Sequence, residues 1–425
     1  MSKLVRRRWE RDQSAGLARR DRVGCDYDAY IPDLLEERTF RFEADVAADL
    51  AEAESSIVLL NERATALRDT EALARLLLRA ESVASSQIEG LEVGGRRLLR
   101  AEAAREAGIS AGDVTAEEVL GNIEAIKWAV DVLGSAETIT VSGILEVHRK
   151  LLAGTRLAAH GGRIRNEQNW IGGSSFNPCG AAFIPPPPED VGLLMDDLCA
   201  FANAELLPAV AQAAIAHSQF ETIHPFIDGN GRTGRALIHV ILKRRGVARN
   251  VLPPVSLVLA TWSSSYIQAL MATRYVGDPD SQEAAQATDG WVALFSAACK
   301  RSVADASAFE ESIQLIQNSW RERIGKVRRN SAIELLISSL PGAPVVTVTS
   351  ASKLIGRTYQ ATNEAIDKLC VVGVLSQVKV GRRNRAFEAR DVIDAFVDLE
   401  RELASPEGDT RTSDPSRPVP GRRQK

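Results

Sequence analysis

The chain has 425 residues, of which 45% are hydrophobic and 25% charged, and this composition is ordinary for a globular protein of roughly two to four domains. The 52 Lys and Arg residues against 56 Asp and Glu residues give a formal charge of −4, which excludes a global positive field for nucleic acid. No run approaches the ~18 apolar residues of a membrane helix, and no apolar core follows the basic start. We therefore expect no membrane association and no signal peptide.

The cysteines give little sign of a structural role. They are five in number, far apart, and without a CxxC pair: Cys25, Cys179, Cys199, Cys299 and Cys370. This pattern indicates neither a zinc site nor a disulfide framework, so we expect reduced cysteines in a cytoplasmic protein. Aromatic residues make up only 5%, and this favours helices over sheet.

The N-terminal part of the chain changes character near residue 30. Residues 1–29 are charged and irregular, which predicts a loosely ordered lead. Apolar residues at helical spacing then predict helices over 42–67 and from about Thr70 to Ile88, the second ended by Gly90. We expect residues 30–110 to form an N-terminal helical region.

Residues 162–187 interrupt the helical pattern of a larger helical core over 111–325. Glycine-rich turns alternate here with two short apolar runs, 169–171 and 182–184, before a polyproline stretch. This pattern predicts a β-hairpin with a long tip. Helical periodicity resumes at about residue 189 and returns several times up to residue 318.

The C-terminal part begins near Ser331 with the order helix–helix–helix–hairpin and a final helix from Asp391. This order predicts a winged helix over 331–400. Four basic residues would lie on its hairpin, within reach of a DNA backbone: Lys379, Arg382, Arg383 and Arg385. Winged helices equally serve as protein-docking or dimer modules. Residues 404–425 contain four prolines and almost no large apolar residue, which predicts a disordered tail.

The most informative segment is His224 to Arg235, with the sequence HPFIDGNGRTGR. Its Gly-Asn-Gly turn lies just before a predicted helix, so backbone N–H groups and the positive end of the helix dipole would converge on one point. Arg232 and Arg235 are three residues apart and can both project toward an anion bound there. The segment therefore predicts a phosphate-binding nest.

Two further residues add a metal ligand and a general base to this predicted phosphate site. Asp228 supplies a hard oxygen ligand of the kind that Mg²⁺ prefers. His224 can exchange a proton near neutral pH and could serve as a general base. Each residue taken singly is explained as readily by a glycine turn, a surface histidine or a helix cap, but the combination within one short segment indicates phosphoryl or nucleotidyl transfer.

The segment resembles HxFx[DE]GNGRxxR, the active-site signature of Fic (Fido) proteins. The resemblance extends over about residues 30–310 and implies a mainly α fold, namely a Fic-type helical bundle with a β-hairpin flap, here followed by a C-terminal winged helix. It implies a protein adenylyltransferase, which transfers AMP from ATP to a Tyr, Thr or Ser hydroxyl of a target protein and releases pyrophosphate.

The resemblance also assigns roles to the motif residues. His224 would be the catalytic base that activates the target hydroxyl, and Asp228 would hold Mg²⁺ against the phosphates. The other motif positions would bind the phosphates of ATP: Gly229, Asn230, Gly231, Arg232 and Arg235. The hairpin over 162–187 looks like the family's flap, expected to dock the target by β-strand addition through Trp170, Ile171, Gly172 and Gly173.

A second segment, Ser85 to Gly90, resembles the inhibitory motif [ST]xxxE[GN] of Fic proteins whose inhibitory helix precedes the active site. Ser85 and Glu89 are four residues apart, which places them on one helix face. Taken alone, Glu89 is explained as a solvated residue beside a glycine cap. The resemblance implies that it pairs with Arg235 and excludes the γ-phosphate, so that the enzyme restrains itself.

The expected partners are ATP and a target protein or the chain itself; DNA through the winged helix and a homodimer are both left open. One alternative is a de-AMPylase, or a transferase of another nucleotide, acting with the same site. Another is a winged-helix DNA-binding regulator with an inactive Fic core, which the intact His224 and nest argue against. The segment after the motif helix, Pro253 to Leu259, differs from the Tyr- and Ser-rich one of close relatives, so the nucleotide base stays undetermined.

Overall fold

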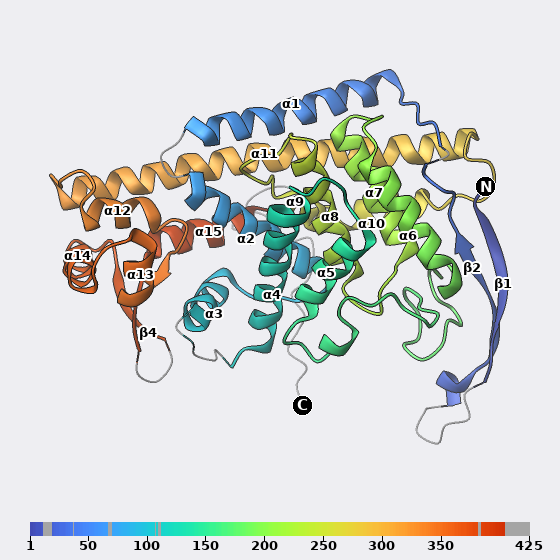
Figure 1. Ribbon diagram of the computed structural model, residues 1–425, viewed down its shortest axis with the longest axis horizontal. Coiled ribbons are helices and arrows are strands. Elements are labelled where there is room, and N and C mark those ends of the chain that lie inside the picture. The colour runs from blue at the N-terminus through green and yellow to red at the C-terminus, as the bar shows by residue number, and fades with distance from the viewer. Residues whose placement is uncertain are drawn as a thin grey trace. The chain divides into compact units, whose positions relative to one another are not determined.

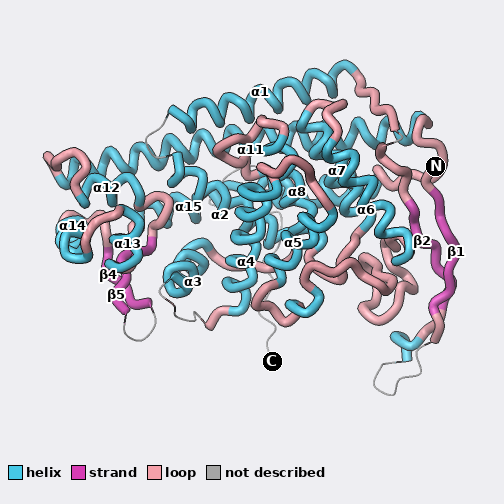
Figure 2. The backbone as a smooth tube through the Cα atoms, viewed as in Figure 1, coloured by secondary structure: helices cyan, strands magenta, loops and turns pink. Residues whose placement is uncertain are grey.

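The computed structural model describes residues 1–11, 19–36, 38–66, 70–106, 108, 112–380 and 384–403. As predicted, the backbone is mainly helical (Figure 2). The α-helices are α1 (Ala44–Ala66), α2 (Thr70–Ile88), α3 (Gly95–Glu106), α4 (Val114–Trp128), α5 (Val141–Leu152), α6 (Pro188–Asn203), α7 (Ala209–Ile223), α8 (Asn230–Arg244), α9 (Val255–Thr261), α10 (Ser263–Ala272), α11 (Gln282–Ile324), α12 (Ala332–Ser339), α13 (Val348–Ile355), α14 (Tyr359–Val371) and α15 (Arg390–Leu403). The strands are β1 (Lys3–Trp9), β2 (Cys25–Ile31), β3 (Val345–Val346), β4 (Ser376–Val380) and β5 (Asn384–Glu388).

The chain, coloured by residue number in Figure 1, divides into two units, each assembled from separated stretches of the sequence. The first unit is Met1–Glu54, Ala125–Gly246 and Ser264–Ala297; the second is Ser55–Glu124, Val247–Ser263 and the chain from Ala298 onward. The expected N-terminal region and catalytic core each contribute residues to both units, whereas the expected winged helix falls entirely within the second.

The first unit is organised around α7, a helix in which every residue is buried. It packs against α6 and α8. Gly234 on α8 makes the close approach to α7 possible, because a Cβ atom there would lie 2.8 Å from Glu221 Oε1 and 2.9 Å from Phe220 Cδ1. The core of this unit thus holds in place α7, which precedes the HPFIDGNGRTGR segment, and α8, which contains its second half.

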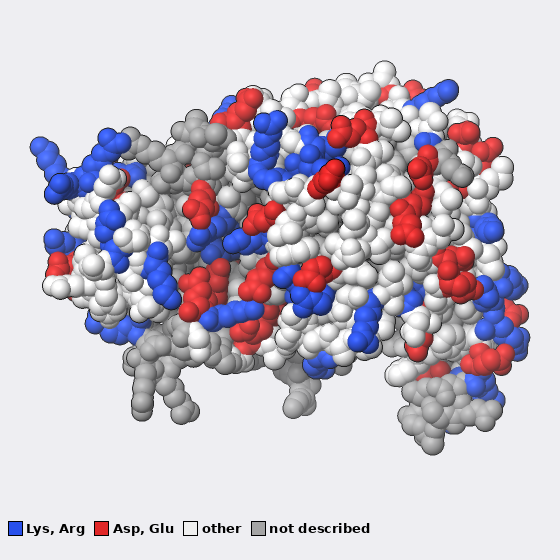
Figure 3. Space-filling view, in the orientation of Figure 1, with Lys and Arg blue, Asp and Glu red and all other residues white. Residues whose placement is uncertain are grey.

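The N-terminus is not the loose lead that we expected. β1 and β2 form an antiparallel hairpin whose register runs from the pair Lys3–Ile31 to the pair Trp9–Cys25. Ion pairs link Arg6 to Asp28 and Arg8 to Asp26 across the strands, and blue and red side chains lie side by side over the hairpin (Figure 3). The arginine run of β1 looked irregular because its acidic partners lie about twenty residues further along the chain.

Cys25 and Cys179 form a disulfide, so the expectation of reduced cysteines is wrong for this pair. Their Cα atoms are 5.9 Å apart although 154 positions separate them in the sequence, which is why their spacing gave no signal. The bond joins the first residue of β2 to the segment that we predicted as the flap. Cys199, Cys299 and Cys370 are free thiols, and the first two are buried.

Replacing both Cys25 and Cys179 with serine is expected to lower the unfolding temperature of the chain. A cross-link between residues 154 positions apart lowers the conformational entropy of the unfolded chain. In the chain-entropy account this raises the free energy of unfolding by at most about 5 kcal/mol. Thermal unfolding with and without dithiothreitol measures the effect, and the reduced wild type should match the double variant. Cys370→Ser is the control. An unfolding curve of the wild type that does not change on reduction would contradict the disulfide.

The flap is less regular than predicted. Ile171 and Phe183 form one isolated antiparallel bridge, with N–H···O distances of 2.8 Å and 3.2 Å between their backbones. The residues expected to pair therefore do so, but no strand forms among the described residues of this segment. Glycines with positive φ at positions 172 and 173 turn the chain away after a single pair.

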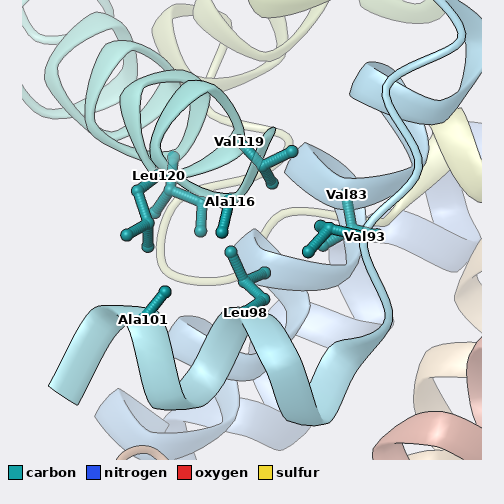
Figure 4. Packing of buried hydrophobic residues seen from close by; sticks show 8 residues of the cluster. Val83, Val93, Leu98, Ala101, Ala116, Val119 and Leu120 are labelled. Atoms are coloured by element: carbon teal, nitrogen blue, oxygen red, sulfur yellow. The ribbon is translucent and has the colours of Figure 1, made fainter. Parts of the chain in front are cut away.

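In the second unit, α2, α3 and α4 enclose an apolar cluster (Figure 4). Its buried members are Val83, Val93, Leu98, Ala101, Ala116, Val119, Leu120 and Ile123. The burial of these side chains fixes the helix that carries the Ser85–Gly90 segment and the chain that follows it.

The C-terminal helices and hairpin follow the predicted order. A short additional strand, β3, pairs with β5, so the antiparallel sheet has the order β3-β5-β4. Arg382 and Arg383, the side chain of Lys379 and the predicted disordered tail over 404–425 lie outside the described residues. The winged helix and its binding to DNA stay predictions.

No single helix in the described part of the chain is long and apolar enough to span a membrane. The sharply bent pair α9 and α10 passes the same test only when the two helices are taken together.

Candidate active site

The loop from His224 to Gly229 connects α7 to α8. His224 follows the last residue of α7 in the left-handed conformation, with φ 49° and ψ 60°, and its N–H donates to Phe220 O at 2.9 Å. Gly229 also has a positive φ, 79°, immediately before α8. Left-handed backbone is uncommon for a residue other than glycine, so neighbouring groups must hold His224 in place.

Asn230 closes this loop. Its side-chain Oδ1 accepts from the Phe226 N–H and its Nδ2 donates to the Phe226 carbonyl, both at 2.8 Å. The Phe226 ring is fully buried. The side chain of Asn230 is thus occupied within the loop, and its predicted contact with phosphate falls to its backbone N–H.

The loop ends at the N-terminus of α8, where backbone N–H groups and two arginines lie. The first hydrogen bond of this helix runs from Thr233 N–H to Gly229 O, so the backbone N–H groups of the first turn have no partner within the helix. Arg232 is only 4% exposed, and its buried Nε has no hydrogen-bond partner among the residues that the structure describes. Arg235, one turn on, is also buried. The first turn of α8 therefore combines backbone N–H groups without partners in the helix and a buried arginine, and its binding of phosphate stays a prediction.

Asp228 lies at the open side of the loop, with 48% of its side chain exposed. One carboxylate oxygen accepts from the Gly229 N–H at 2.6 Å and is 3.7 Å from Arg232 Nη2. No group of three His, Cys, Asp or Glu side chains that could hold a metal occurs within the described ranges. A single exposed carboxylate beside a helix N-terminus is compatible with Mg²⁺, which takes most of its ligands from phosphates and water.

His148 on α5 supports the loop and gave no sequence signal, because 80 positions separate it from Asp228. Its Nε2 donates to the Asp228 carbonyl at 2.9 Å, and its Nδ1 accepts from the Gly162 N–H at 3.1 Å. The ring stacks on Phe226 with centroids 3.7 Å apart. Burial lowers the pKa of His148 to about 4, so the imidazole is neutral at neutral pH and can accept from Gly162.

Replacing His148 with phenylalanine should keep the stacking on Phe226 but remove both hydrogen bonds. We expect destabilisation by about 1–3 kcal/mol, because the partly buried Asp228 carbonyl and Gly162 N–H lose their partners. Thermal unfolding measures this, with the exposed His160→Phe as control. The pKa of His148 is lowered from 6.5 to about 4, so its contribution should be complete above about pH 6.5 and decline as the pH falls toward 4. Equal unfolding temperatures for both variants would contradict this role.

The four predicted flap residues have different surroundings. Trp170 packs edge-on against Trp9, with ring centroids 5.3 Å apart, and its Nε1 donates to Ser174 O at 2.6 Å. Ile171 forms the bridge to Phe183 described above. Gly172 and Gly173 are exposed. Trp170 therefore anchors the segment, and the two glycines present its backbone to the exterior.

The predicted inhibitory segment belongs to the second unit and ends α2. Ser85 is fully buried within the helix, whereas Glu89 lies just beyond its last residue and is exposed. Gly90, with φ 81°, and the hydrogen bond from Leu91 N–H to Ser86 O terminate the helix in a Schellman motif. The position of Glu89 is thus set by a well-defined helix end.

Comparison with known proteins agrees with the geometry. Residues 138–242 match the model of the Fic/DOC family, and residues 47–131 match that of the Fic/DOC family N-terminal region. Proteins named protein adenylyltransferase Fic from Drosophila sechellia and Drosophila melanogaster are 38% identical to the chain over 139 residues, which is 32% of this chain and 26% of each relative. The match thus spans about a quarter of the length of these relatives.

A solved structure supports the fold over a longer stretch. A Fic family protein from Desulfovibrio desulfuricans superimposes with a TM-score of 0.50 at 18% identity, covering 82% of this chain and 97% of that chain. The resemblance noted in the sequence is confirmed by the two family models: the chain contains a Fic/DOC region over 138–242, preceded by a Fic/DOC N-terminal region over 47–131.

Proposed function

We propose that this chain is a protein adenylyltransferase that transfers AMP from ATP to a hydroxyl group of a target protein. The main support is a single loop, closed by Asn230, that carries His224 at one end and the N-terminus of α8 with the buried Arg232 at the other. A base and an anion site on one rigid loop suit transfer of a phosphoryl-linked group. The named activity of the Drosophila relatives is consistent with this proposal.

The proposed reaction assigns each group a task. The hydroxyl oxygen of a Tyr, Thr or Ser attacks the α-phosphorus of ATP while its proton passes to the His224 imidazole. The bond between the α-phosphorus and the oxygen bridging to the β-phosphate breaks, and pyrophosphate leaves. Arg232, Arg235 and the N–H groups of the first turn of α8 bind the β- and γ-phosphates and stabilise the charge of the leaving group.

Asp228 is the residue that would hold Mg²⁺, since its carboxylate is exposed beside the phosphate site. The ion would neutralise phosphate charge and keep the nucleotide in one orientation. His148 donates a hydrogen bond to the backbone carbonyl of Asp228, so the histidine that stabilises the loop would also fix the position of this carboxylate.

We also propose that Glu89 restrains the enzyme by pairing with Arg235. The support is the inhibitory motif and the exposed carboxylate at a rigid helix end. Removing one member of an arginine–carboxylate pair leaves the other charge free for a new partner, here the γ-phosphate. Such a pair would act as a switch between an ATP-excluding state and an ATP-binding state.

Radiolabelled nucleotides test the proposal. Purified chain incubated with ATP labelled at the α-phosphate should become labelled, whereas ATP labelled at the γ-phosphate should leave no label on protein. UTP and GTP in parallel identify the base, and loss of label after a chase with unlabelled ATP would indicate de-AMPylation. Label from the γ-phosphate, or no label even for the Glu89→Gly variant, would contradict the proposal.

A further inference from the structure

Arg165, at the start of the flap segment, is a buried cation whose hydrogen bonds go to backbone carbonyl groups. Its side chain is nearly inaccessible, with the residue 3% exposed. Nε donates to His224 O at 2.9 Å, Nη2 to Pro186 O at 2.6 Å and Nη1 to Glu167 O at 3.1 Å. Burial lowers its pKa to about 10, so the group stays charged at neutral pH. A guanidinium can donate to several carbonyls at fixed angles, which a lysine ammonium cannot match.

Asn169 reaches the same backbone from four residues further on. Its Nδ2 donates to His224 O at 3.2 Å and to Phe226 O at 3.0 Å. The N–H of Arg165 donates to Pro225 O at 2.9 Å. Three successive carbonyls of the loop from His224 to Gly229, which we call the catalytic loop, therefore accept hydrogen bonds from one short stretch of the flap segment.

These contacts stabilise an unfavourable backbone conformation. His224 has the left-handed conformation described above, and its ψ angle sets the orientation of its carbonyl group and of the peptide bond to Pro225. Two donors on that one carbonyl oppose rotation of the peptide group. Arg165 Nη2 also donates to Pro186 O, and Gln168 Nε2 donates to Pro185 O at 3.0 Å, so the two ends of the flap segment are joined to each other. Arg165 in turn joins both ends to the His224 carbonyl.

We propose that Arg165 and Asn169 are positioning residues that hold the backbone of His224 and join the base to the flap as one rigid body. This inference depends on the proposed function for its catalytic consequence but not for its structural one. A target segment docked on the flap would then meet the imidazole at a fixed distance, which keeps the attacking hydroxyl and the base aligned.

The first test observes His224 directly. The chain has only five histidines, so ¹⁵N-histidine labelling gives few imidazole signals, and the His224→Ala variant identifies that of His224. We expect Asn169→Leu and Arg165→Lys to shift or broaden the His224 signal and leave that of the exposed His160 unchanged. The exposed Arg163→Met and Asn166→Leu, from the same segment, serve as controls. An unmoved His224 signal in both test variants would overturn the proposal.

The second test separates positioning from folding and from nucleotide binding. In the Glu89→Gly background, Asn169→Leu and Arg165→Lys should lower the rate of transfer from α-labelled ATP about 10- to 100-fold, while ATP affinity stays within about twofold. Guanidinium chloride at millimolar concentration should restore part of the rate of Arg165→Ala. Parallel loss of ATP affinity and rate would contradict a positioning role. If the Glu89→Gly parent transfers no label, the proposed function fails, and the His224 signal still decides this inference.

Discussion

The His224→Ala variant is expected to transfer AMP about 10²- to 10⁴-fold more slowly than the parent chain and to bind ATP unchanged. The reason is that the imidazole takes the hydroxyl proton in the proposed reaction, while the phosphates are bound by α8 and its arginines. Transfer of α-labelled AMP measures the rate, and calorimetric titration measures the affinity. The comparison is best made in the Glu89→Gly background, where we expect the activity to be highest.

The left-handed backbone of His224 calls for a second substitution as control. Asparagine tolerates this conformation better than alanine and cannot act as the base. His224→Asn should therefore be as inactive as His224→Ala with a smaller loss of stability. If the asparagine variant kept the parent rate, the loss in the alanine variant would come from the backbone, and the role of the imidazole as base would be wrong.

The Glu89→Gly variant is expected to label itself about 5- to 150-fold faster than the wild type, the range of typical couplings between two sites. Glu89 is exposed at the end of α2, outside the apolar cluster, so its loss should leave the fold of the second unit intact. The α-label assay measures the gain. Glu92→Gly removes another exposed carboxylate three positions away and should have no effect.

A double-mutant cycle tests whether Glu89 acts through Arg235. Arg235→Ala should lower activity because the γ-phosphate loses a cation, and adding Glu89→Gly should then produce no further gain. A full gain in the double variant would show that Glu89 restrains the enzyme by another route.

The sequence predicted the parts of this protein that depend on neighbouring residues. α2 spans Thr70 to Ile88 as its apolar spacing and glycine cap indicated, and α8 begins at Asn230, within the Gly-Asn-Gly turn that was predicted to precede a helix. These features are set by residues a few positions apart, where helix periodicity and capping operate.

What the sequence did not reveal depends on contacts between distant residues. Arg165 is 59 positions from His224, and Asn169 is 57 positions from Phe226. Nothing in the local pattern distinguishes Arg165, which is buried on carbonyl groups, from Arg163, which is exposed two positions earlier. The β1–β2 hairpin was missed for the same reason, since its opposite charges become partners only after the chain reverses.

The attachment of the flap to the N-terminal hairpin has a practical consequence for shortened versions of the protein. A version beginning at residue 30 would remove what looks in the sequence like a dispensable leader. Cys179 would then carry a free thiol, Trp170 would lose Trp9, and Ser174 would lose its hydrogen bond to Asp21. An assay on such a fragment would report a flap detached from its support, whatever the state of the catalytic loop.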